Sequence, residues 1–211
     1  MRTVIFDLDG TLVDTAKDIT ASINFVRSEC YGLPPLEKSR VVDLMNRPGL
    51  NLAYEFYGVE RYEERAKIIF EEHYANQCLQ NATQFDGVAA MLERLEAAGI
   101  KMFVATNAPT ETSKIILEKN SIAHFFEDIV GADRVKNPKP HPEIIEKIVG
   151  ARDRDLCWMV GDSPKDMIAA NKAKIGSIFA GWGVASDILC EEHVGFKAQK
   201  PSEVIDYILN N

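Results

Sequence analysis

The amino-acid sequence predicts an α/β protein, with a doubly wound parallel sheet and an all-helical domain inserted near the start of the chain. Two observations favour this fold class. From residue 85 onward, short apolar runs typical of buried strands alternate with segments that have helical periodicity. Between the first strand and this alternating region, residues 16–82 contain helical patterns alone. We therefore predict a core domain made of residues 1–15 and 83–211, and a helical domain made of residues 16–82.

The first predicted strand, residues 3–6, ends directly before two aspartates. Its β-branched and aromatic residues are typical of a buried strand, and Asp7 and Asp9 follow at the carboxyl edge of the sheet. Side chains two positions apart point the same way in an extended chain, so both carboxylates are expected to face one point. Gly10 then allows the chain to turn away from the strand. Like charges this close raise each other's pKa unless a cation lies between them, and a hard divalent ion is the natural candidate.

The helical domain is predicted from apolar residues that recur at three- and four-residue steps. This spacing runs from Ala16 to Cys30 and predicts the first helix, which Gly32 and two prolines end. Arg-Pro-Gly at residues 47–49 and Gly58 separate the helical patterns that follow. Those patterns cover residues 37–46, 50–57 and 62–79.

The rest of the chain predicts helices and strands in alternation. The first of these helices begins near Val88, and Gly99 ends it. The predicted strands are residues 101–105, 128–130, 156–160 and 177–180, with a weak strand near Phe196. The later predicted helices are residues 110–120, 142–149, a segment ending near 173, a helix after the Gly181-Trp182-Gly183 turn, and a last helix from Ser202.

Polar side chains gather after four of the predicted strands. They are Asp7 and Asp9 after the first strand, Thr106 after the second, Lys139 in the loop after the third, and Asp162 and Asp166 after the fourth. Sheets of this type bind ligands beyond the carboxyl ends of their strands, at a switch in strand order. We expect these side chains to form the functional site.

Composition and charge exclude several classes of function. The chain of 211 residues is 46% hydrophobic, enough for one α/β domain with a smaller attachment. Its formal net charge of -8 argues against nucleic acid or an anionic membrane as the main partner. No segment has the ~20 apolar residues that cross a bilayer, and we expect no export signal. The scattered cysteines predict neither a zinc site nor a disulfide framework, so we expect free thiols in a reducing cytoplasm.

Four motifs, in this order, resemble those of the haloacid dehalogenase (HAD) superfamily. They are D-L-D-G-T-L-V-D-T at residues 7–15, T-N at 106–107, K-P-H-P at 139–142 and G-D-S-P-K-D at 161–166. The resemblance covers the whole chain and implies a Rossmann-like core. The helical domain is similar to the small cap of the phosphoglycolate phosphatase-like group, and F-D-G-V at 85–88 is close to that group's usual entry into the core.

The resemblance also implies roles for the residues at the sheet edge. Asp7 is expected to be the nucleophile that takes the phosphoryl group, and Asp9 the general acid and then the general base. Thr106 is expected to donate to the phosphoryl oxygens, and Lys139 to supply positive charge beside Asp7. Mg²⁺ is expected to bind the carboxylates of Asp7 and Asp162 and the backbone carbonyl of Asp9.

Other candidate site residues have alternatives. Asp166 is a candidate metal ligand that acts through water or hydrogen bonds, or else a helix cap. Thr106 has a second interpretation as the cap of the helix that follows. Asn107 and Arg47 are predicted to bind substrate. For Arg47 the predicted contact is a bidentate one with an anionic group at the far end of the substrate. The alternative is that Arg47 is a solvent-exposed arginine at the end of a helix.

Two positions depart from the superfamily's usual pattern. Lys174 stands where many relatives have the glycine that ends a helix, so we expect this helix to end differently, because lysine is strained in the left-handed conformation. Asp86 occupies a position where proline is frequent.

We therefore predict a Mg²⁺-dependent phosphatase that acts on a small-molecule phosphate ester through an aspartyl-phosphate. One alternative is a phosphomutase of the same fold, which returns the phosphoryl group to a sugar phosphate. The other is a regulatory protein that binds a phosphate ligand without turnover. The sequence predicts neither the leaving group nor the oligomeric state.

Overall fold

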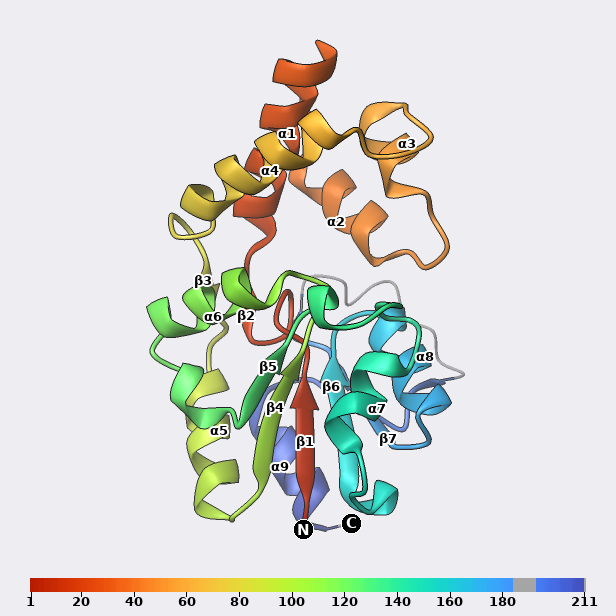
Figure 1. The fold of residues 1–211 in the computed structure, drawn as a ribbon. Helices are drawn as coiled ribbons and strands as arrows, with labels where there is room; N and C mark the ends of the chain where they lie inside the picture. The colour runs from red at the N-terminus through yellow and green to blue at the C-terminus, as the bar shows by residue number, and fades with distance from the viewer. Residues whose placement is uncertain (184–192, 211) are drawn as a thin grey trace.

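The computed structural model describes residues 1–183 and 193–210. In this part of the chain, six parallel strands form one sheet in the order β5-β4-β1-β6-β7-β8 (Figure 1). The strands are β1 (Thr3–Phe6), β4 (Lys101–Ala105), β5 (Asp128–Val130), β6 (Cys157–Gly161), β7 (Gly176–Ala180) and β8 (Phe196–Ala198). The chain builds β1, β4 and β5 outward, then crosses back so that β6 pairs with the other side of β1. This reversal is the switch in strand order that the sequence predicts.

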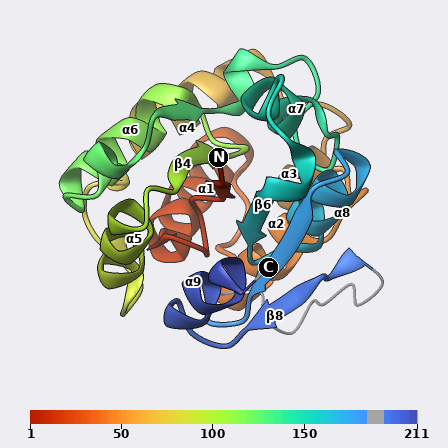
Figure 2. The same ribbon diagram turned by 90° about the horizontal axis from the view of Figure 1, so that it is seen from below.

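Both faces of the sheet are buried because side chains along each strand alternate between two apolar clusters. In β1, Val4 and Phe6 belong to one cluster and Ile5 to the other. Helices α5 (Val88–Ala97), α6 (Thr110–Lys119) and α9 (Ser202–Leu209) contribute to the first cluster. Helices α7 (Glu143–Val149) and α8 (Pro164–Lys172) contribute to the second, on the opposite face (Figure 2). The predicted doubly wound α/β fold is confirmed.

The first four helices of the chain form a group beyond the carboxyl ends of the strands (Figure 1). They are α1 (Ala16–Tyr31), α2 (Lys38–Asn46), α3 (Leu52–Tyr57) and α4 (Glu64–Gln77), and we call them the helical insert. The antiparallel pair β2 (Val13–Asp14) and β3 (Thr83–Gln84) joins both ends of the insert to the core. This pair was not predicted, because two residues are too few to show strand alternation.

Most predicted elements match the structure to within one or two residues. The predicted strands 3–6, 101–105 and 128–130 coincide with β1, β4 and β5. The helix predicted after Gly181-Trp182-Gly183 lies outside the described residues. Short 3₁₀ helices, which carry no apolar periodicity of their own, were not predicted. They are Ala123–Phe125, Ala132–Arg134 and Arg154–Leu156.

The described residues 1–183 and 193–210 include no helix that is long and apolar enough to span a membrane. Cys30, Cys78 and Cys157 are free thiols.

Lys174 itself adopts the left-handed conformation, with φ of 56°. Helix α8 ends at Lys172, and the N–H of Lys174 donates to the carbonyl of Asn171 at 3.0 Å. The lysine therefore takes the backbone conformation of the expected glycine, and the prediction of a differently ended helix was wrong. Asp86, the other departure, lies exposed in the turn before α5.

Replacing Lys174 by glycine should stabilise the protein. The Lys174→Gly variant relieves left-handed strain, so we expect the free energy of unfolding to rise by about 0.5–1 kcal/mol after the entropic cost of glycine. The matched control, Lys172→Gly, removes an exposed lysine from the last turn of α8 and should lower it by about 0.5–1 kcal/mol. Urea unfolding measures both, and equal destabilisation of the two variants would contradict this account.

Candidate active site

The predicted site residues converge at the switch point of the sheet. Asp7 follows β1, Thr106 follows β4, and Asp162 follows β6. Since β4 and β6 flank β1, the three carboxyl ends are adjacent. Lys139 comes from the loop before α7, and Asp166 lies in the first turn of α8. Ligands bind at this position in open α/β sheets.

The ammonium group of Lys139 is at the centre of the site. It is almost fully buried. Its Nζ lies 2.8 Å from Oδ1 of Asp7 and 2.6 Å from Oδ1 of Asp166, and it donates to the carbonyl of Ala105 at 2.7 Å. These three contacts use all three donors of the ammonium. Burial alone lowers the pKa of Lys139, but the charges of Asp166 and Asp7 outweigh it and hold the pKa above its ordinary value.

Asp7 is held in one orientation by donors on Oδ1. The N–H of Leu8 donates to this oxygen at 2.8 Å, beside Lys139. Burial and the negative charge of Asp166 raise the pKa of Asp7 to about 7, although Lys139 acts in the opposite direction. The charge of Lys139 alone therefore does not hold the pKa of Asp7 at its ordinary value.

Asp9 lies beside Asp7 and is connected to the helical insert. Its carboxylate accepts a hydrogen bond from the hydroxyl of Thr15, the residue directly before α1. Burial raises the pKa of Asp9, and the Thr15 hydrogen bond opposes this shift. A raised pKa keeps a proton on the carboxyl group nearer to neutral pH, which suits a general acid.

Three carboxylates form a cluster that fits a divalent cation. Asp7, Asp162 and Asp166 each place an oxygen within 4.8 Å of the others. Asp162 is fixed by close packing, because a Cβ at Gly10 would lie 2.2 Å from its Oδ2 and a Cβ at Gly183 would lie 2.4 Å from its Cβ. The cluster has three carboxylates, and the ammonium of Lys139 touches two of them. These three carboxylates and this ammonium together carry an excess of negative charge. All the side-chain ligand atoms of the cluster are oxygens, as Mg²⁺ prefers.

Both oxygens of Asp166 already accept hydrogen bonds or ion-pair contacts. Oδ1 contacts Lys139, and Oδ2 accepts from the N–H of Ser163 at 3.2 Å and from its hydroxyl at 2.6 Å. Asp166 and Ser163 thus form a capping box at the start of α8. The predicted capping alternative is present in the structure, and a metal role for Asp166 stays a prediction.

Thr106 is fully buried at the end of β4 and lines the cavity described below. Its hydroxyl oxygen accepts from the N–H of Ala108 at 3.0 Å, which leaves the hydroxyl proton able to donate. It does not cap the next helix: the N-cap of α6 is Pro109, and the N–H of Thr110 donates to Asp133. The capping alternative for Thr106 is therefore wrong.

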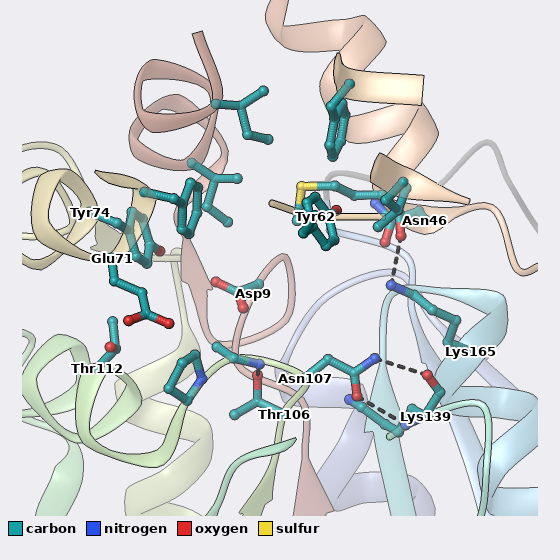
Figure 3. A pocket seen from close by; sticks show the side chains of 18 of the residues that line it. Asp9, Asn46, Tyr62, Glu71, Tyr74, Thr106, Asn107, Thr112, Lys139 and Lys165 are labelled. Atoms are coloured by element: carbon teal, nitrogen blue, oxygen red, sulfur yellow. Dashed lines mark hydrogen bonds between the residues drawn. The ribbon is translucent and has the colours of Figure 1, made fainter. Parts of the chain in front are cut away.

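The side chain of Asn107 holds the backbone of Lys139. Its amide donates to the carbonyl of Lys139 at 2.9 Å, and its Oδ1 accepts from the N–H of Lys139 at 3.0 Å (Figure 3). The sequence predicts a substrate contact for Asn107, but its side-chain amide is engaged in positioning Lys139.

A cavity of about 420 Å³ lies between these residues and the helical insert. Figure 3 shows Asp9 between Tyr62 and Tyr74 of the insert on one side and Thr106 of the core on the other. Lys165, in the first turn of α8, also lines the cavity and donates to the carbonyl of Met45 at 2.6 Å. Lys165 was missed, although it lies inside the motif at residues 161–166.

Arg47 does not line this cavity. Its Nε pairs with Asp43 at 2.8 Å, and its side chain is 56% exposed. The predicted substrate contact of Arg47 is therefore absent from this arrangement. The insert contributes aromatic residues instead, which sequence periodicity does not distinguish from ordinary core residues. They are Phe56, Tyr57, Tyr62, Phe70 and Tyr74.

Comparison with known proteins gives the family and agrees with the fold. Residues 4–180 match the family model described as haloacid dehalogenase-like hydrolase. A phosphoglycolate phosphatase of Rhodospirillum rubrum is 32% identical over 198 residues, which cover 88% of this chain and 82% of the relative. Among solved structures, a predicted phosphatase from Clostridium acetobutylicum is 27% identical with a TM-score of 0.83, covering 100% of this chain and 99% of the other. A predicted β-phosphoglucomutase from Thermotoga maritima is 25% identical with a TM-score of 0.73, covering 100% and 99%.

The family model covers most of the chain, and the relatives align along nearly all of it. The protein therefore belongs to the haloacid dehalogenase-like hydrolase family.

Proposed function

We propose that the protein is a Mg²⁺-dependent phosphatase that hydrolyses a small phosphomonoester through an aspartyl-phosphate on Asp7. One observation carries this proposal. The buried Asp7 carboxylate is oriented by Lys139 and faces a cavity that Asp9 and Thr106 also line. Family membership and the names of the relatives support the same reaction class.

In the first step, a carboxylate oxygen of Asp7 attacks phosphorus while the bond from phosphorus to the leaving oxygen breaks. Asp9 gives its proton to that oxygen, so the leaving group departs as an alcohol. The hydroxyl of Thr106 would donate to the phosphoryl oxygens as their negative charge spreads, and Lys139 would supply positive charge beside Asp7.

In the second step, water attacks phosphorus and the bond to Asp7 breaks. Asp9, now ionised, takes a proton from the water, which restores both aspartates and releases inorganic phosphate. The Asp9 carboxylate keeps its position for both transfers through its hydrogen bond to Thr15.

The acidic cluster provides the ligands for the metal. Asp7 and Asp162 would hold Mg²⁺, with the backbone carbonyl of Asp9, and Asp166 would support the site through its contacts with Lys139 and Ser163. When bound, the ion neutralises charge on the phosphoryl group and on Asp7.

The helical insert is proposed to act as a cap domain over the cavity. Residues 16–82 would form this cap, and residues 1–15 and 83–211 the core. Closure of the cap would exclude bulk water and select the leaving group. The partner is a small phosphate ester, and a reducing cytoplasm is the proposed location, supported by the free thiols of Cys30, Cys78 and Cys157.

A phosphomutase is the second candidate, because a predicted β-phosphoglucomutase shares the fold. It would transfer the phosphoryl group from Asp7 to a sugar phosphate and yield an isomer in place of inorganic phosphate. A binding protein without turnover is disfavoured, because Asp7, Asp9, Thr106 and Lys139 all line one cavity.

Asp7→Asn should abolish phosphate release from small phosphomonoesters in the presence of Mg²⁺. The amide cannot act as the nucleophile, so we expect kcat/KM to fall by about 10³-fold or more. The control is Asp128→Asn at the start of β5, whose carboxylate pairs with Arg134 far from the cavity. It should keep kcat/KM within about twofold of wild type. Turnover of Asp7→Asn at the wild-type rate would exclude this mechanism.

Asn107→Ala should lower kcat by about tenfold with little change in KM, because the residue positions Lys139 and does not bind the leaving group. Asn107→Asp keeps one of the two hydrogen bonds and should restore part of the loss. Steady-state kinetics measures both variants. A large rise in KM with unchanged kcat would support the substrate-binding role instead.

Arg47→Ala should leave both kcat and KM within about twofold of wild type, because its side chain pairs with Asp43 outside the cavity. The same kinetic assay measures this. A rise in KM of about tenfold or more would show that Arg47 reaches the substrate after all.

A further inference from the structure

The cavity wall that the helical insert supplies is mainly apolar and aromatic. Ile23, Phe56, Tyr62, Phe70 and Tyr74 all line it. The rings support one another: Phe70 and Tyr74 stack with their centroids 5.5 Å apart. In Figure 3, Tyr62 and Tyr74 lie across the cavity from Thr106, with Asp9 between them. A leaving group that extends from the phosphoryl group toward the insert would therefore lie against these rings.

Some side chains of this wall are buried in the protein core, and others are partly exposed to solvent. Phe56 and Tyr74 are buried in the core cluster. Tyr62 is 42% exposed, and Phe70 is partly buried against the same cluster. Burial raises the pKa of Tyr62 to about 12 and raises the pKa of Tyr74 above its ordinary value. The phenol groups therefore stay neutral at physiological pH.

The insert adds no net positive charge to the cavity. Of the described residues, its charged contributors to the lining are Lys67 and Glu71, which have opposite sign. The ammonium of Lys67 lies 3.4 Å from Glu64, and Arg47 is paired with Asp43 outside the cavity.

On the core side, the charge of Lys139 is balanced by Asp7 and Asp166. Lys165 donates to the neutral carbonyl of Met45 and keeps its charge on the core side of the cavity, where it opposes the rise in the pKa of Asp9. A second anionic group on the leaving group that extends toward the insert would meet mainly apolar side chains, where desolvation of a charge is costly.

We propose that the leaving group of the substrate is uncharged and carries a planar apolar ring that packs against Tyr62, Phe70 and Tyr74. This inference rests on the proposed phosphatase function and adds the substrate class. A cavity of about 420 Å³ has room for a phosphoryl group and one ring system. Burial of the ring and its contacts with the aromatic side chains stabilise the bound substrate relative to water.

The test compares two primary alkyl phosphates that differ in the group beyond the reacting end. Benzyl phosphate presents an uncharged ring, and phosphoglycolate presents a carboxylate. We expect kcat/KM for benzyl phosphate to exceed that for phosphoglycolate by about tenfold or more. Equal values, or a preference for phosphoglycolate, would overturn the inference while leaving the phosphatase function intact.

Two variants and a control show whether the wall is responsible. Phe70→Ala and Tyr62→Ala each remove one ring, and each should lower kcat/KM for benzyl phosphate by about fivefold to tenfold without a comparable loss on phosphoglycolate. Tyr54→Ala removes an aromatic ring on the outer surface of the insert, where Tyr54 is 62% exposed, and should change neither value. Equal losses on both substrates in both ring variants would contradict the proposed contact.

A binding measurement tests the preference for a ring without relying on phosphate release. The wild-type protein with Mg²⁺ is titrated with 2-phenylethylphosphonate and with 3-phosphonopropionate, the non-hydrolysable counterparts of the two esters. Calorimetry should give a Kd about tenfold lower for the phenyl compound. If neither ester releases phosphate, this comparison still decides whether the cavity prefers a neutral ring to a carboxylate. Equal Kd values, or tighter binding of 3-phosphonopropionate, would overturn it.

Discussion

The site depends on one buried ammonium group that lies between two carboxylates. Lys139 contacts Asp7 and Asp166, and its third donor is taken by the carbonyl of Ala105. Buried ions are tolerated only when every donor and acceptor has a partner, and loss of one member of such a pair costs about 3–5 kcal/mol. This constraint accounts for the surrounding polar contacts. Asn107 fixes the backbone of Lys139, and Ser163 binds the far oxygen of Asp166. The remaining excess of negative charge fits the proposed divalent cation.

The loop of residues 7–15 connects this charged centre to the helical insert. Asp7 and Asp9 lie at its start, and Thr15, which donates to Asp9, lies at its end. Within the loop, the indole N–H of Trp182 donates to the carbonyl of Thr11 at 3.0 Å, and Thr11 is fully buried. A shift of α1 relative to the sheet would therefore reach the proposed general acid through Thr15. This links the position of the insert to the chemistry.

The sequence predicts those parts of the structure that are determined by local sequence pattern. It does not predict the side-chain partners that are determined by tertiary contacts. The strands were recognisable as short apolar runs, and Asp7, Thr106 and Asp162 were placed at one sheet edge because parallel strands share an edge. The pairing of Arg47 with Asp43 was not predicted, because it depends on the geometry of α2 and the turn after it. The hydrogen bonds of Asn107 to Lys139 were not predicted, because they join residues 32 positions apart. The aromatic lining of the cavity likewise arises only when α3 and α4 pack together with the core.

The central claim is that Asp7, oriented by Lys139, carries the phosphoryl group during turnover. Rapid acid quench of the reacting protein, followed by proteolysis and mass spectrometry, tests this claim most directly. We predict that the peptide containing Asp7 gains the mass of one phosphoryl group, with Asp7 as the modified residue, and that the modification disappears once substrate is exhausted. A phosphoryl group on any other residue, or release of phosphate with no modified peptide at any quench time, would contradict the account.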